Sequence, residues 1–200
     1  DHRVKIAQRT ANRKSRIRGK AGKGLHGKSR KARGLDLIVA QLFELLKADL
    51  DILFRGHMIP NASRNGNETM QKQTFYVTNS VPQLQDRFNG SIWQSLEKAL
   101  QTIGKSEEIY VVTGVTFNKV GENNNISYAT PKDDPSQNCA IPNYFYKVVL
   151  KVNKSGSTIN SASAIGFWFV HQDYTGQDYA AYAVSVDQIE QWTGMDFFVN

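Results

Sequence analysis

Residues 54–104 carry an ordered series of local patterns that constrains the fold more than any other part of the chain. Runs of β-branched and aromatic residues predict strands, an Asn-Gly pair at 65–66 marks a turn, and a Gly-free stretch ending at Gly104 predicts a helix. The predicted elements are a strand at Phe54–Ile59, a polar loop at Pro60–Met70, a strand at Thr74–Thr78 and a helix from Asn89 or Ser91 through about Ile103. The order is therefore strand, long loop, strand, helix.

The rest of the chain after this series is also rich in strand patterns. Ser185 with Gln188 three residues later has the spacing of a capping box, so a short helix is expected through about Trp192, with a stop at Gly194. Further strands are predicted at Glu108–Phe117, Tyr144–Val152 and Ala164–His171, with an Asn- and Pro-bearing excursion at Asn118–Pro142. With 200 residues, 40% of them hydrophobic, the chain can form one globular domain with a substantial core.

Charge divides the chain into two unequal parts. Residues 1–34 contain 13 Lys/Arg and one acid, a net charge of +12, whereas residues 35–200 contain 12 Lys/Arg and 17 acids, a net charge of −5. The basic segment has almost nothing large and apolar to bury, so we expect a disordered tail. It is either an arm that binds nucleic acid without sequence preference, or a solvated tail, a targeting remnant or a reading-frame artefact. The candidate phosphate contacts in it are Lys28, Arg30, Lys31 and Arg33.

Residues 35–53 predict a Leu-rich helix, because they lack Gly and Pro and contain many Leu and Ala residues. The apolar positions are too numerous for one narrow stripe, which indicates burial on more than one side or pairing with another chain, as in a homodimer. The predicted organisation is a basic tail at 1–34, a helical segment at 35–53 and a catalytic domain at 54–200.

The sequence gives little information about compartment. No apolar run is long enough to cross a bilayer, and the basic first residues lack the apolar region of a signal peptide. The single Cys139 excludes an intrachain disulfide and is read as a loop thiol or, less simply, as an intermolecular bridge.

Four polar residues in the region 55–97 have the chemistry of phosphodiester cleavage. Arg55 offers a fixed cation for phosphate, and His57 a base that titrates near neutrality. Asn89 and Glu97 are eight residues apart, which would place both on about the same face of a continuous helix. Oxygen ligands on one face suit Mg²⁺, which keeps several waters, and the missing thiolate and second His argue against zinc.

These residues also carry a resemblance to a known family. From Phe54 to the C-terminus the chain resembles the DNA/RNA non-specific endonucleases, the ββα-metal or His-Me finger nucleases that include endonuclease G. The matching segments are Phe54-Arg55-Gly56-His57, Phe75–Gln83, the series Asn89, Gly90, Trp93, Leu96 and Glu97, and the later segments Tyr110–Gly114, Ile141–Val148 and Thr193–Phe198. The resemblance implies an α+β fold: a mixed, mainly antiparallel β-sheet core with a ββα-metal finger that carries the active site.

The resemblance also implies a role for each site residue. His57 would be the general base that deprotonates a water for in-line attack on phosphorus, leaving a 5′-phosphate, and Arg55 would hold a phosphate oxygen. Asn89 would bind the single Mg²⁺ directly and Glu97 would hold it through a water, with Mn²⁺ or another divalent cation as a substitute. Asn79 would support the arrangement of His57 and metal, and Arg87 is a further candidate contact to nucleic acid. DNA and RNA would both be substrates.

Each of these residues also has a structural interpretation. Asn89 could be only a helix N-cap, Glu97 a solvated helix residue and Asn79 a turn former. His171, at the end of an aromatic strand, is expected to be structural.

The chain departs from the family pattern in two places. Phe54 stands where the family has Asp before Arg-Gly-His, and residues 1–53 show no recognisable upstream strands. Two alternative functions follow. One is a catalytically impaired nuclease-like domain that binds nucleic acid through its basic tail; the other is a nuclease toxin or effector with an immunity or inhibitor protein as partner. The family resemblance suggests a secreted or periplasmic location.

Overall fold

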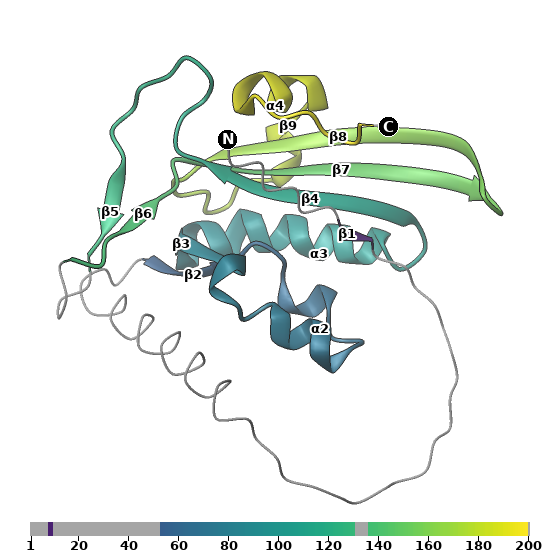
Figure 1. Ribbon diagram of the computed structural model, residues 1–200, viewed down its shortest axis with the longest axis horizontal. Helices are drawn as coiled ribbons and strands as arrows, with labels where there is room; N and C mark the ends of the chain where they lie inside the picture. The colour runs from purple at the N-terminus through teal and green to yellow at the C-terminus, as the bar shows by residue number, and fades with distance from the viewer. Residues whose placement is uncertain (1–7, 10–52, 131–135, 200) are drawn as a thin grey trace, which may run out of the picture.

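A computed structural model describes residues 8–9, 53–130 and 136–199 and shows an antiparallel sheet covered by helices (Figure 1). The main sheet has the order β1-β4-β7-β8-β9, and every neighbouring pair is antiparallel. Its strands are β1 Gln8–Arg9, β4 Glu108–Thr116, β7 Tyr144–Ser155, β8 Thr158–Val170 and β9 Ala183–Val184. The predicted α+β fold with a mainly antiparallel core is therefore confirmed.

Helices cover both faces of this sheet, α3 (Gln94–Ile103) on one face and α4 (Val186–Thr193) on the other (Figure 1). On one face, η3 (Gln85–Trp93) and α3 bury Phe88, Trp93 and Leu96 against Phe145 of β7 and other core residues. On the other face, α4 buries Ile189 against side chains of β7 and β8. The central strand β7 is thus buried on both sides, because alternate residues belong to different cores.

The ββα unit joins this core through its helix. Strand β2 (Leu53–His57) pairs antiparallel with β3 (Ser80–Leu84), and η3 follows directly after β3. Val81 and Leu84 pack against the aromatic cluster that also contains Phe88 and Trp93. The two-stranded ribbon is therefore held by the same core that holds the main sheet.

The long connection between the two strands differs from the prediction. The segment contains η1 (Asn61–Ser63), α2 (Glu68–Gln73) and η2 (Val77–Asn79), and Thr74–Thr78 is not a strand. Thr74 instead ends α2: its hydroxyl donates to Gln71 O, and its carbonyl accepts from Asn79 Nδ2. The second strand begins six residues later than predicted, because these local hydrogen bonds outweigh the β propensity of the segment.

Most other predicted elements are confirmed within a few residues. Strands β4, β7 and β8 correspond to the predicted runs, although β4 and β8 each end one residue earlier than expected and β8 starts six residues earlier. Ser185 caps α4 by accepting from Gln188 N, and Gly194 ends it with a φ of 66°. The excursion after β4 contains a small hairpin, β5 (Ser127–Ala129) with β6 (Cys139–Ile141).

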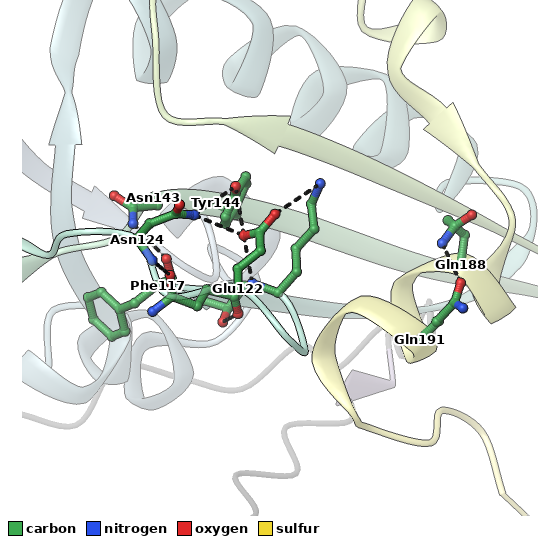
Figure 2. Close-up of polar contacts among 10 residues, drawn as sticks. Phe117, Glu122, Asn124, Asn143, Tyr144, Gln188 and Gln191 are labelled. Carbon is green, nitrogen blue, oxygen red and sulfur yellow. Dashed lines mark hydrogen bonds and ion pairs between the residues drawn. The ribbon is translucent and has the colours of Figure 1, made fainter.

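A polar network fixes the first part of this excursion (Figure 2). Figure 2 shows Glu122 facing both Tyr144 and Asn124, and the Tyr144 hydroxyl donates to Glu122 Oε2 over 3.0 Å. Asn143 Nδ2 donates to Phe117 O over 2.6 Å. These hydrogen bonds therefore attach the loop to the start of β7.

The basic and Leu-rich N-terminal segments lie almost entirely outside the described residues. The exceptions are Leu53, which belongs to β2, and Gln8–Arg9, which form β1 on the edge of β4. The expectation of disorder throughout 1–34, and of no strand before Phe54, is therefore wrong at Gln8–Arg9. The predicted contacts Lys28, Arg30, Lys31 and Arg33 lie outside the described residues.

Candidate active site

His57 and Arg55 occupy the same face of β2, because alternate residues of a strand point to the same side. Burial, and then the nearby charge of Arg55, lower the pKa of His57 below its usual 6.5. Its Nε2 atom is buried without a hydrogen-bond partner among the protein atoms, and the ring of Phe75 meets the imidazole edge to face at a centroid distance of 5.7 Å. His57 is therefore a neutral imidazole at physiological pH, as a general base must be.

Gly56 of β2 leaves room for the side chain of Gln83 from the paired strand β3. A Cβ atom on Gly56 would lie 1.7 Å from Oε1 of Gln83, whose side chain is fully buried across the glycine. The ribbon that carries Arg55 and His57 therefore needs a residue without a side chain between them.

Asn79 fixes the backbone that leaves His57. Its Oδ1 accepts from Ile59 N over 2.9 Å, and its Nδ2 donates to Ile59 O over 3.0 Å and to Thr74 O over 2.9 Å. Its own carbonyl accepts from Met58 N. Since the side chain is fully occupied by these backbone bonds, Asn79 can act as a positioning residue for the His57 end of β2, and no described contact joins it to the imidazole itself.

Asn89 lies on η3, which packs against both β2 and β3. Its Nδ2 donates to Gln85 Oε1 over 3.0 Å, and its Oδ1 takes no hydrogen bond from the described residues. The amide is therefore oriented so that its oxygen remains free for a cation. The expected N-cap interpretation does not apply, because Asn89 lies inside η3 rather than at its start.

Glu97 is placed differently from the prediction. The regular helix on which Asn89 and Glu97 were expected to share a face is interrupted at Ser91, whose φ and ψ of −110° and −109° are not helical. Glu97 faces the sheet, where its Oε1 lies 3.3 Å from Nζ of Lys147, and its side chain is 12% exposed. Burial raises the pKa of Glu97, and the attraction of Lys147 opposes this. No described contact joins Glu97 to Asn89.

The remaining predicted residue, Arg87, lies on the surface of η3. Its side chain is 65% exposed and forms an ion pair with Asp173 over 3.4 Å. An exposed pair of this kind is worth at most about 1 kcal/mol, so the guanidinium can exchange its partner for a phosphate at little cost.

His171 is structural, as expected. Its Nε2 accepts from Leu84 N over 2.9 Å and its Nδ1 lies 3.0 Å from Pro142 O, so it ties the end of β3 to the end of β8 and the start of β7. Burial lowers its pKa to about 4. His171 therefore stays neutral and keeps the ββα unit in place.

Residues that sequence reasoning missed are Phe75, Gln85, Ser80 and Lys147. Gln85 had a signal in its position four residues before Asn89, and Phe75 and Ser80 lie within the segment that matches the family pattern. Lys147 had none, because its contact with α3 depends on how the sheet and the helix pack.

A hollow of about 490 Å³ lies at the other end of the ribbon, beside Leu53, Leu84 and His171, and includes neither His57 nor Asn89. Among the described residues no group of three His, Cys, Asp or Glu side chains could hold a metal ion, so a cation at the candidate site would have few protein ligands.

No helix of the described part of the chain is long and apolar enough to cross a membrane.

Comparison with known proteins gives a family match over almost the whole chain. The family model for DNA/RNA non-specific endonucleases matches residues 4–200. A nuclease of Nostoc sp. is 29% identical over 151 residues, which cover 73% of this chain and 50% of that protein. The mitochondrial nuclease EXOG of Homo sapiens is 31% identical over 150 residues, which cover 72% of this chain and 39% of that protein. The chain thus spans half or less of the length of these relatives.

A solved structure shares the fold. A chain from the crystal structure of the EndoG/EndoGI complex superimposes with a TM-score of 0.57 at 22% identity, covering 74% of this chain and 60% of that one. The family match begins at residue 4, well upstream of the motifs at Phe54. This corrects the expectation that residues 1–53 lack the upstream part of the family pattern.

Proposed function

Because the chain belongs to the DNA/RNA non-specific endonuclease family, we propose that it hydrolyses phosphodiester bonds within DNA and RNA, with a divalent cation and His57 as general base. The observation that carries the proposal is the pairing of a neutral His57 with Arg55 on one face of β2. Asn89, with its free amide oxygen, lies on the helical segment packed against the same ribbon.

His57 would take a proton from a water as that water attacks phosphorus. Its lowered pKa keeps it unprotonated at neutral pH, which a base requires. Arg55 is a permanent cation beside it and would hold a non-bridging phosphate oxygen, which orients the phosphorus toward the attacking water. The bond from phosphorus to O3′ breaks, O3′ takes up a proton from solvent water, and the phosphate stays on the 5′ end of the other product.

The donor set fits Mg²⁺ better than zinc or a fully protein-caged ion. Asn89 would hold the cation through Oδ1 and Glu97 through a water, and Mn²⁺ could substitute because it accepts the same oxygen ligands. When bound, the cation would stabilise the negative charge that develops on the phosphate and on O3′. Asn79 would act at a distance, by holding the backbone after His57 in place.

The test is cleavage of supercoiled plasmid and of RNA by the purified chain, with Mg²⁺ or with chelator. We expect loss of both substrates with Mg²⁺ only, and a decrease of roughly 100- to 10,000-fold for His57→Ala, the usual contribution of a general base. Asn89→Ala should act similarly, whereas Asn160→Ala on the exposed part of β8 serves as a matched control.

Activity of His57→Ala close to that of the original chain would contradict the proposed mechanism. DNA that is retarded on a gel but remains intact, with or without metal, would instead indicate a binding protein. A homodimer and an inhibitor protein stay predictions, which light scattering and copurification would check.

A further inference from the structure

His57 and Ser80 face each other across the β2–β3 ribbon. They are register partners at the last pair of the ladder. The next pair is joined by a backbone bond from Met58 N to Asn79 O, and Ser80 N donates to Val77 O instead of to His57. His57 and Ser80 thus form a non-hydrogen-bonded pair, in which Cα atoms are about 4.5 Å apart and side chains are closest.

Both side chains have a buried polar atom without a partner. Nε2 of His57 and Oγ of Ser80 are each buried and make no hydrogen bond to protein atoms. Buried polar groups in folded proteins are almost always paired, and two such orphans on directly opposed residues of one face are natural partners for each other.

Four other side chains near His57 have no described hydrogen bond to its Nε2. Arg55 carries only donors, and Phe75 presents an apolar ring. Both amide hydrogens of Asn79 are used by Ile59 O and Thr74 O, and its Oδ1 accepts from Ile59 N. Phe54 stands where the family has a carboxylate, is 46% exposed and points to the opposite face of β2 from His57.

We propose that Ser80 is a positioning residue for the general base, with one bridging water that accepts a hydrogen bond from His57 Nε2–H and donates one to Ser80 Oγ. This bridge selects the tautomer with the proton on buried Nε2, which leaves Nδ1 unprotonated toward the reacting water. It also holds the ring in one rotamer and stabilises the imidazolium that forms when His57 takes the proton. The proposal rests on the role of His57 in the proposed function.

The matched pair Ser80→Thr and Ser80→Val tests the bridge. Both residues are β-branched and nearly equal in volume, but only Thr keeps the hydroxyl, so both should fold with the same melting temperature. We expect Ser80→Thr to keep most of the activity and Ser80→Val to lose about 10-fold or more in kcat with little change in KM, as for the loss of a hydrogen bond to a charged group.

Two readouts separate this role from a structural one. The acid limb of the kcat/KM profile should move to lower pH in Ser80→Val, because the protonated ring loses an acceptor; Arg55, the charged group that acts on His57, is unchanged. ¹⁵N NMR of the imidazole should show mainly the Nε2–H tautomer in the original chain and in Ser80→Thr, and a mixture in Ser80→Val.

The NMR measurement does not need nuclease activity, so it tests this proposal even if the proposed function fails. Equal kinetics of the Thr and Val variants, or an unchanged tautomer in Ser80→Val, would overturn the role of Ser80.

Discussion

Lys147 Nζ lies 3.3 Å from Glu97 Oε1 in the interior of the domain, with the two side chains only 1% and 12% exposed. The same ammonium donates to Thr113 Oγ1 over 3.0 Å and lies 4.1 Å from the ring centroid of Trp93. Burial lowers the pKa of Lys147, and Glu97 opposes that shift. A candidate metal-site carboxylate on α3 is thus fixed by a counter-ion on the central strand of the sheet, so the position of Glu97 is decided by the core.

Replacing Lys147 with Met should therefore destabilise the domain strongly, because Glu97 would remain buried without a counter-ion. We expect the free energy of unfolding to fall by about 3–5 kcal/mol, measured by urea denaturation. Adding Glu97→Gln should restore much of the loss. Lys151→Met is the control on the same strand, since its ion pair with Glu107 is exposed and should be worth less than about 1 kcal/mol. Equal effects of the two Lys variants would contradict the buried pair.

Removing the charge of Arg55 should raise the pKa of His57. Burial is the larger cause of the lowered value and Arg55 the second, so the value should rise but stay below 6.5. In Arg55→Gln we expect the acid limb of the kcat/KM profile to move to higher pH and the maximum to fall, because the phosphate contact is lost too. Arg87→Gln should leave the limb in place. An unmoved limb in Arg55→Gln would mean that His57 is not the titrating base.

Acid should destabilise the domain in part through His171. Its pKa is about 4 when folded and 6.5 when unfolded, so between these values only the unfolded chain binds the proton. The free energy of unfolding is therefore expected to fall as the pH is lowered from about 6.5 to about 4, by up to about 3 kcal/mol. His57, whose pKa is also lowered, acts in the same direction. In His171→Gln, urea denaturation across this range should show a weaker dependence on pH, and the original dependence would refute the assignment.

A methyl group at position 56 should disrupt the catalytic ribbon. In Gly56→Ala the new Cβ would overlap the buried side chain of Gln83, so we expect a loss of about 1–3 kcal/mol in stability and a larger loss of activity. Gly66→Ala, which meets nothing within 4 Å, is the control for the general effect of replacing glycine. Thermal unfolding and plasmid cleavage of both variants would check this, and a fully active, stable Gly56→Ala would show that the ribbon tolerates a shift.

Elements with strong local signals could be predicted from the sequence. The helix from Ser185 to Gly194 is specified by its own cap and stop residues, and the strands β4, β7 and β8 by long β-branched and aromatic runs. The segment Thr74–Thr78 has the composition of a strand, yet its backbone is held by Asn79 and the end of α2. Composition alone could not show this, because the decisive partners lie outside the segment.

The order of residues along the chain specifies the chemistry available to this protein: an Arg, a His, and amide and carboxylate oxygens in the order of the nuclease family. It also determined most of the strands and both principal helices, since hydrophobic periodicity and capping act within a few residues. How the site residues are held depends instead on the packing of the elements against one another. The backbone at Ser91 interrupts the helix between Asn89 and Glu97. Lys147 forms a buried ion pair with Glu97, and Ser80 lies opposite His57 in the β2–β3 ladder. These relationships join residues from different elements, so they arise from packing and strand register, which no local pattern specifies.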